Sequence, residues 1–125
     1  MLSKQHHIAI ICSDYEKARA FYIDKLGFRL VREVWREQQQ DYLRMLQFGD
    51  TTLELFIHPN APRRVTDPEA MGLRHLAFHV ENEEEGEKWL HSLGIETEPI
   101  REDKCNGGRF LFFKDPDGLP LELHE

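Results

Sequence analysis

Apolar and polar residues alternate with a period of two in several short segments, and this alternation predicts half-buried β-strands. Two of these segments begin at His7 and His75. Turn residues such as Gly49-Asp50 and Asn106-Gly107-Gly108 separate others. The remaining predicted strands cover about residues 28–36, 42–48, 52–57, 95–101, 109–114 and 119–124.

A helical spacing of apolar residues follows the first strand of each half of the chain. A capping box, Ser13 with Glu16 and later Asn82 with Glu85, precedes each helical segment, and a glycine placed for a left-handed C-cap ends it. The pattern therefore predicts two helices. Their apolar stripes are Ala18, Phe21, Tyr22 and Leu26 before Gly27, and Trp89, Leu90 and Leu93 before Gly94.

The chain repeats itself at an offset of 68 residues. His7-Ile8-Ala9-Ile10 matches His75-Leu76-Ala77-Phe78, and Leu53-Glu54-Leu55 matches Leu121-Glu122-Leu123. The order of elements is the same around both matches, so the sequence predicts two βαβββ units in an α+β fold. We expect one domain over residues 1–125, with unit 1 at about 5–58, a proline-containing connection at about 59–72 and unit 2 at about 73–125.

The composition fits an ordinary globular protein. The formal charge of −7 argues against binding to nucleic acid, which needs a basic surface. No apolar run reaches the roughly 20 residues that span a bilayer, and the first residues lack the apolar core of a signal peptide, so we expect a cytoplasmic protein. For Cys12 and Cys105 we expect two free thiols, and one disulfide is the alternative. The acidic run from Glu81 to Glu87 is expected to be a solvated helix start.

The repeated histidines and glutamates are candidate metal ligands. Because side chains alternate across a strand, each glutamate points away from its flanking leucines, and His7 and His75 lie on the same faces as the glutamates. Imidazole nitrogen and carboxylate oxygen together suit Zn, Ni, Co, Fe or Mn. The alternative is that each is an ordinary polar side chain on the wet side of a sheet. The shared offset favours ligands, so we predict one divalent metal site made of His7, Glu54, His75 and Glu122.

Other histidines are weaker candidates. His6 is a second choice beside His7, whereas His58, His91 and His124 are expected to be surface groups. His79 shares the face of His75, where it either lines a cavity or is buried against a backbone partner.

The spaced motifs resemble the vicinal oxygen chelate superfamily along essentially the whole chain, and small bacterial glyoxalase-like proteins most of all. The resemblance is carried by His7-x-Ala-Ile, Asp14-Tyr15-Glu16-Lys17, Phe21-Tyr22-x-x-x-Leu26-Gly27-Phe28, the two Leu-Glu-Leu segments, His75-Leu76-Ala77-Phe78 and Phe113-x-Asp115-Pro116-Asp117-Gly118. It implies two βαβββ units that form a curved, cup-shaped mixed sheet. Members of this superfamily often dimerise, so the resemblance also implies a homodimer. The two halves would pair either within one chain or between two.

The ligand set His-Glu-His-Glu resembles that of bacterial glyoxalase I, which uses nickel, cobalt or zinc. The resemblance implies a metal-dependent lyase or isomerase that acts on a small oxygen-chelating substrate, such as a thiol adduct, through a metal-stabilised enediolate. It further implies that Glu122 is the general base that moves a proton from C1 to C2 and that Glu54 is its counterpart.

Two positions differ from glyoxalase I. The arginine that grips glutathione four residues after the first ligand is Ile11, and the asparagine four after the second is His58. The resemblance therefore does not extend to the glutathione-binding positions, although Arg74, Arg101 or Arg109 remain candidates for binding another anion.

Other members of the superfamily provide the alternatives. One is a thiol transferase or an epimerase. Another is a drug-binding protein that lines its cup with aromatic rings, here Phe48, Phe56, Phe110 and Phe112.

Overall fold

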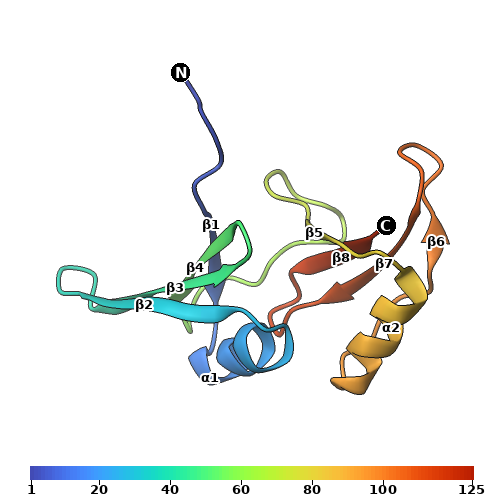
Figure 1. Cartoon of the computed structure of the whole chain (residues 1–125). Helices are drawn as coiled ribbons and strands as arrows, with labels where there is room; N and C mark the ends of the chain where they lie inside the picture. Colours follow the sequence, from blue (N-terminus) through green and yellow to red (C-terminus); the bar gives the residue numbers. More distant parts are fainter. The chain divides into compact units, whose positions relative to one another are not determined.

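Each half of the chain forms a βαβββ unit in the computed structural model, which describes all residues from 1 to 125. Unit 1 comprises Met1–Pro62 and unit 2 comprises Arg63–Glu125 (Figure 1). The predicted α+β class with two repeated units is confirmed. No helix is both long enough and apolar enough to cross a membrane.

Unit 1 is a four-stranded mixed sheet with one helical segment. The strand order is β1-β4-β3-β2, in which β1 pairs parallel with β4 and the other pairs are antiparallel. Its elements are β1 (Ile8–Cys12), α1 (Tyr15–Ala18), the π-helical continuation η1 (Arg19–Lys25), β2 (Arg29–Arg36), β3 (Asp41–Phe48) and β4 (Thr51–Ile57).

Unit 2 repeats this topology with the order β5-β8-β7-β6 and a parallel β5–β8 pair. Its elements are β5 (Leu76–His79), α2 (Glu83–Ser92), β6 (Arg101–Glu102), β7 (Arg109–Lys114) and β8 (Pro120–His124). Between β4 and β5 the chain has no helix or strand, only an isolated bridge between Thr66 and Glu69.

The leucines that flank each candidate glutamate form the core of its unit, as the alternation predicted. In unit 1, Leu53 and Leu55 are fully buried, and so is Tyr22 of η1. In unit 2, Leu121 is fully buried and Leu123 nearly so, with Leu90 of α2 beside them. The helices cover the leucine faces, so Glu54 and Glu122 project from the opposite face of each sheet, hereafter the ligand face.

The helix boundaries differ from the prediction in one cap. Asp14, not Ser13, is the N-cap of α1, and its carboxylate accepts a hydrogen bond from the backbone N–H of Lys17 at 3.0 Å. Asn82 caps α2 as predicted, by accepting from the N–H of Glu85 at 2.9 Å. Gly27 (φ 84°) and Gly94 (φ 71°) end the helical segments in the left-handed conformation that favours glycine.

The sixth strand is much shorter than predicted. Strand β6 contains only Arg101–Glu102, whereas residues 95–101 were expected to be extended and paired. Ile95 is buried in the core, the backbone N–H of Glu98 donates to Phe112 at 2.8 Å, and Pro99 has no N–H to continue the ladder. Both cysteines are free, Cys12 buried and Cys105 exposed.

Candidate metal site

His7 and Glu54 lie together on the ligand face of unit 1. The parallel register pairs Ala9 with Glu54, and His7 lies two residues before Ala9, so its side chain is on the same face. His7 Nε2 is 3.4 Å from Glu54 Oε2. The side chains are 38% and 12% exposed, so the imidazole is accessible while the carboxylate is largely enclosed.

His75 and Glu122 form the matching pair in unit 2. Ala77 pairs with Glu122 in the parallel β5–β8 register, and His75 precedes Ala77 by two residues. His75 Nε2 is 2.8 Å from Glu122 Oε2, and the side chains are 26% and 10% exposed. The ring of Phe112 packs edge-on against His75 with centroids 5.1 Å apart, which fixes the orientation of the imidazole.

The donor atoms of each pair fit adjacent ligands of one divalent ion. Two ligands that bind at about 2.1 Å and subtend a right angle are separated by about 3 Å. The nitrogen–oxygen separations of 3.4 and 2.8 Å lie on either side of this value. No group of three or more His, Cys, Asp or Glu side chains gathers as a metal site. Each unit therefore contains one His–Glu pair, and the four-residue ligand set stays a prediction.

The second ring nitrogen of each candidate histidine also has a neighbour. His7 Nδ1 is 2.8 Å from His6 Nδ1, and His75 Nδ1 is 3.4 Å from Arg74 Nη1. Contacts at the nitrogen that faces away from the ligand atom orient an imidazole and set its tautomer. In both pairs it is Nε2 that faces the glutamate.

Two other histidines of unit 2, His79 and His124, differ in exposure and in their partners. His79 is exposed, with Nδ1 3.2 Å from the carbonyl of His124, so it has a backbone partner without being buried. His124 is not the surface group that was expected: its side chain is 21% exposed, and Asp103, 3.0 Å from its Nε2, raises its pKa. Its ring also stacks on Phe110.

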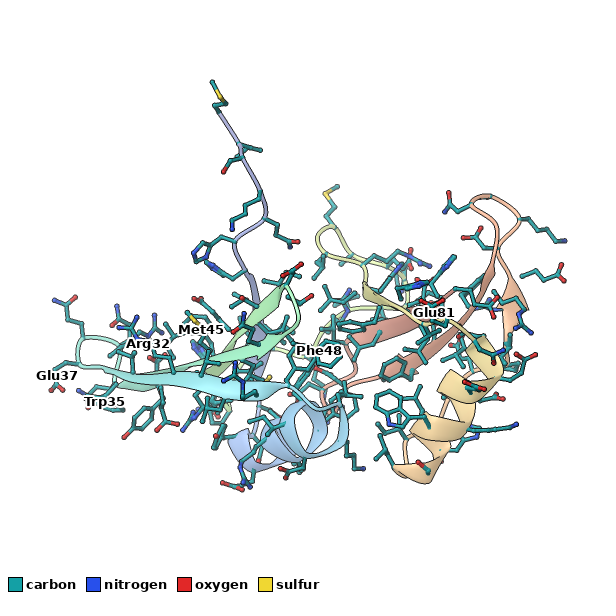
Figure 2. The ribbon with its side chains drawn as sticks, in the orientation of Figure 1. Arg32, Trp35, Glu37, Met45, Phe48 and Glu81 are labelled. Atoms are coloured by element: carbon teal, nitrogen blue, oxygen red, sulfur yellow. The ribbon has the colours of Figure 1, made fainter.

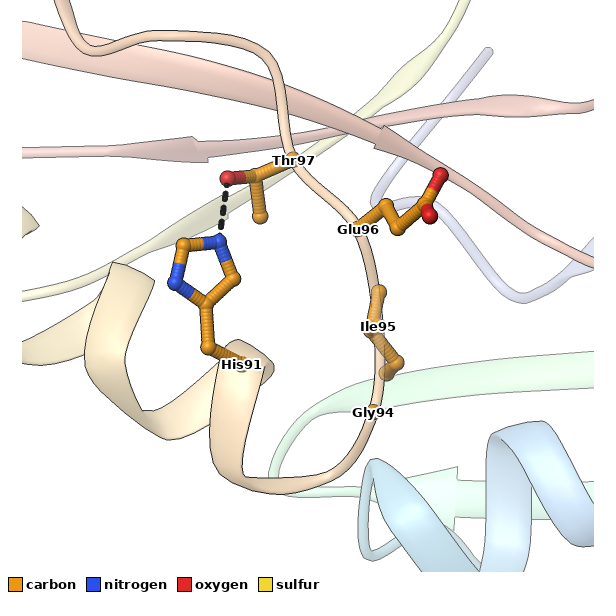
Figure 3. Close-up of a pocket in the computed structure, with 5 residues that line it drawn as sticks. All are labelled: His91, Gly94, Ile95, Glu96 and Thr97. Atoms are coloured by element: carbon orange, nitrogen blue, oxygen red, sulfur yellow. Dashed lines mark hydrogen bonds between the residues drawn. The ribbon is translucent and has the colours of Figure 1, made fainter.

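His91 lines a shallow pocket at the end of α2 with Gly94, Ile95, Glu96 and Thr97 (Figure 3). Its Nε2 is 2.9 Å from the Thr97 hydroxyl oxygen. None of these residues belongs to the predicted ligand set, and Glu96 points along the outside of the loop in this view.

A second polar cluster lies on the ligand face of unit 1 and was missed by the sequence reasoning. Arg36 donates to both carboxylate oxygens of Asp41, at 2.7 and 2.6 Å, and His58 Nε2 is 3.4 Å from the same carboxylate. The Arg36 hydrogen bonds hold the pKa of Asp41 below its ordinary value. His58 was expected to be a surface group at the start of the connection, and it is half exposed yet part of this cluster.

Three of the four phenylalanines proposed to line a cup lie on a ligand face. Phe56 is two residues from Glu54 on β4, Phe112 pairs directly with Glu122, and Phe110 pairs with His124. Phe48 is on the other side, where its ring packs 5.4 Å from that of Phe28. The expectation that Phe48 faces the cup is therefore wrong, because its strand position shares the face of the buried Leu46.

Arg109, one of the candidate anion-binding residues, is already bound by two carboxylates at the helix-covered side of unit 2. Its guanidinium bonds Glu84 and Glu125, and Arg109 lowers the pKa of Glu125 to about 2. Glu83, in the acidic run that was expected to be solvated, is fully buried beside this cluster. Burial raises the pKa of Glu83 to about 7.

Comparison with known proteins decides the family. The family model described as the glyoxalase/bleomycin resistance protein/dioxygenase superfamily matches residues 4–123. The chain belongs to this superfamily. This superfamily is the one also called the vicinal oxygen chelate superfamily, so the family predicted from the sequence motifs is confirmed, and so is the glyoxalase fold. The superfamily's description joins enzymes, a glyoxalase and a dioxygenase, with a resistance protein, so membership alone does not give the activity.

Three similar superfamily proteins cover nearly the whole chain. The uncharacterized protein YwkD of Bacillus subtilis (strain 168) is 55% identical over 100% of this chain and 98% of its own length. The uncharacterized protein YaeR of Escherichia coli (strain K12) is 48% identical over 99% and 97%. The crystal structure of the glyoxalase family protein from Enterococcus faecalis is 50% identical, covers 98% of this chain and 97% of that chain, and has a TM-score of 0.93.

Proposed function

We propose that the chain is a metal-dependent lyase or isomerase of the glyoxalase type that acts on a small substrate with two neighbouring oxygens. The observation that carries the proposal is the repeated pair, in which an imidazole Nε2 faces a carboxylate Oε2 at the same position of both units. His7, Glu54, His75 and Glu122 would hold one divalent cation, with nickel, cobalt or zinc expected first and iron or manganese as further options.

A bound cation would act as a Lewis acid on the two substrate oxygens and make the hydrogen on the adjoining carbon more acidic. His7 and His75 would contribute nitrogen donors to this cation. Glu54 and Glu122 contribute negative charge, which a cation offsets and which would otherwise be costly for two carboxylates in one site.

Glu122 is the proposed general base and Glu54 its counterpart. Each carboxylate is paired with the histidine of its own unit and with no other charged side chain. Both are largely enclosed, which favours proton transfer over exchange with water. In this scheme Glu122 removes the proton at C1 and a carboxylate returns it at C2, so the substrate is isomerised without net loss or gain.

The test combines elemental analysis with an assay. Protein purified without a chelating tag is expected to contain a first-row divalent metal, and His75→Ala to contain much less. With nickel or cobalt added, the protein is expected to convert methylglyoxal and a thiol to the lactoyl thioester, and Glu122→Gln to lose at least about a hundredfold in rate, which is typical for a general base. Metal-loaded protein that turns over no hemithioacetal of any thiol would contradict the glyoxalase activity.

The same preparation separates the alternatives. Product identification with epoxides or acyl thioesters would reveal a thiol transferase or an epimerase instead. The rings of Phe56, Phe110 and Phe112 on the ligand faces favour a second candidate, a small-molecule binding protein without catalysis. That function predicts ligand binding to the metal-free protein that is unchanged by Glu122→Gln. We further propose that the protein is a homodimer and that one metal site takes ligands from a unit 1 and a unit 2, which pair either within one chain or between two.

A further inference from the structure

Arg36 is placed on the same sheet face as the His7–Glu54 pair. Phe56 shares a face with Glu54 because the two are separated by two residues on β4, and Phe56 pairs with Leu43 on β3. Asp41 is two residues from Leu43 and pairs with Arg36 on β2. The side chains of Arg36, Asp41, Phe56 and Glu54 therefore project from the ligand face of unit 1.

The Arg36 side chain is held in one orientation. Its Nε and Nη2 donate to the two carboxylate oxygens of Asp41, at 2.7 and 2.6 Å, and its guanidinium carbon lies 4.6 Å from the centroid of the Phe56 ring. Arg36 is 28% exposed and Asp41 only 14%, so the pair is not an ordinary solvated surface ion pair. Bidentate pairing and ring stacking both restrict an arginine, so little further ordering is needed when it binds a ligand.

The guanidinium keeps donors available toward the solvent side. Of its five N–H groups, two are used by Asp41, and the other three make no hydrogen bond with the protein. His58 Nε2 lies 3.4 Å from Oδ2 of the same carboxylate, so Asp41 is shared between Arg36 and His58. Hydrogen bonding to Asp41 is the main cause that raises the pKa of Arg36, and the charge of Glu54 adds to the rise, which is consistent with a location near the candidate metal pair.

We propose that Arg36 is a binding residue for an oxyanion, and that the substrate carries a carboxylate or phosphoryl group near the two oxygens that the metal would bind. The free edge of a guanidinium presents parallel N–H groups that match either oxyanion. The part of this proposal that concerns the substrate rests on the proposed function, whereas anion binding by Arg36 does not.

The other arginines near the ligand faces are less suited to this role. Arg101 lies over the rings of Phe110 and Phe112 at 4.9 and 5.7 Å, but it and its partner Glu98 are both 53% exposed. Arg74 is 62% exposed, and its partner Glu69 is 58% exposed. Arg36 is the arginine on a ligand face that combines a largely enclosed carboxylate, a ring beneath it and unused donors.

The first experiment uses the metal-free full-length protein and two probes, inorganic phosphate and acetate. Each is titrated while the arginine side-chain N–H resonances are followed by NMR. We expect the Arg36 resonance to shift with saturation, and Arg36→Gln to weaken binding of the effective probe about tenfold, as expected for the loss of a charge-assisted hydrogen bond. The probe that binds more tightly identifies whether the subsite prefers a phosphoryl or a carboxylate group.

Two variants control for charge and folding. Arg19→Gln removes the same charge from an exposed arginine of η1, which pairs only with Asp24 at 3.8 Å, and it should leave binding unchanged. Arg36→Lys keeps the charge opposite Asp41 but loses the planar fork, so it should fold and bind with an intermediate affinity. The proposal is wrong if Arg36→Gln, like Arg19→Gln, binds both probes with the affinity of the parent protein. It is also wrong if neither probe shifts the Arg36 resonance.

The second experiment uses the nickel-loaded protein and a matched pair of probes, dihydroxyacetone and dihydroxyacetone phosphate. Both have a carbonyl beside a hydroxyl, but only one has a phosphoryl group. If the metal-free titration selects phosphate, the phosphorylated probe should bind about tenfold more tightly, and Arg36→Gln should remove that difference. Should the protein prove to bind no metal, this experiment fails while the metal-free titration still succeeds, so failure of the proposed function is distinguished from failure of the Arg36 subsite.

Discussion

Among single residues, Glu83 has an environment that its sequence does not suggest. It begins α2 within an acidic run, where a carboxylate normally faces solvent and benefits from the helix dipole. In the structure the side chain is fully buried, and neither carboxylate oxygen has a hydrogen-bond partner. Burial, followed by the negative charge of Glu125, raises its pKa to about 7, with Glu122 adding to the rise and His124 and Arg109 opposing it.

This environment predicts a stability that falls as the pH rises. The folded-state pKa of about 7 exceeds the ordinary value of 4.5, so the folded protein holds the Glu83 proton more tightly than the unfolded chain. The contribution is complete below about pH 4.5 and is lost as the pH rises toward and through 7. Glu83→Gln, which resembles the protonated acid, should therefore raise the free energy of unfolding by about 1–3 kcal/mol at pH 8 and change it little at pH 4.5.

Urea denaturation at the two pH values measures this difference. Glu85→Gln provides the control, because Glu85 is an exposed carboxylate in the same turn of α2 and its replacement should show no such pH dependence. A Glu83→Gln effect that is the same at pH 4.5 and pH 8 would show that the carboxylate is ionised in the folded protein throughout.

At the scale of elements, α2 approaches β8 more closely than an ordinary side chain allows. Gly86 faces the sheet, and a Cβ added there would lie 2.8 Å from Leu123 Cδ1, with Val80 at ordinary contact distances. Gly86→Ala should therefore destabilise the protein by about 1 kcal/mol or more through overpacking, although alanine normally stabilises the middle of a helix. Leu123 is 3% exposed, so its side chain has little room to move aside.

A double-mutant cycle isolates the contact. Leu123→Val removes the methyl group that would clash, at a cost of its own of about 1 kcal/mol. The combined variant should lose less unfolding free energy than the sum of the losses of the two single variants, by at least about 0.5 kcal/mol in thermal or urea unfolding. Strict additivity would mean that the helix adjusts its position and that Leu123 does not limit the approach.

The elements that the sequence predicted well are those set by local alternation and spacing. In both Leu-Glu-Leu segments the leucines are buried in the core of the unit and the glutamate is on the opposite face of the sheet, as period-two patterning requires, although Glu122 is also buried. The choice between Ser13 and Asp14 as the cap was not decidable in this way, because both residue types cap helices. The structure decides it: the backbone of Asp14 is extended, and its carboxylate accepts from Lys17. The predicted strand at 95–101 is wrong over most of its length because Ile95 is buried in the core and Pro99 has no N–H for the ladder, so strand pairing begins only at Arg101.

The Arg36 cluster could not be predicted because it depends on the register of the β2–β3 hairpin. That register shifts at a bulge between Leu30 and Arg32, so the alternation of apolar residues before the bulge gives the wrong face after it. Figure 2 shows the result: Arg32 and Met45 project on one side of the hairpin and Trp35 on the other. Gln40, with φ 54°, also lies in the turn that brings Asp41 opposite Arg36.

At the scale of the whole molecule, the repeat gives each unit its own sheet, helix and buried leucines, but only half of the predicted ligand set. A His–Glu pair alone offers two donors, whereas four donors from both units would complete most of a first-row site. A shared ion would therefore be a property of the molecule and not of either unit, and its binding should depend equally on His7 and His75, which are 68 positions apart in the sequence.

Metal-linked stability tests this claim. A ligand that binds only the folded state at a hundredfold excess over its Kd stabilises it by about 2.7 kcal/mol, so nickel should raise the Tm of the parent protein by several degrees. His7→Ala and His75→Ala should each abolish most of that rise, because either change removes a ligand of the same ion. His79→Ala, which alters an exposed histidine of β5, should retain it. If the units bound separate ions, each alanine variant would instead keep about half of the bound metal, with the other site titrating as before. Equal and nearly complete loss from both variants is the result that only a shared ion explains.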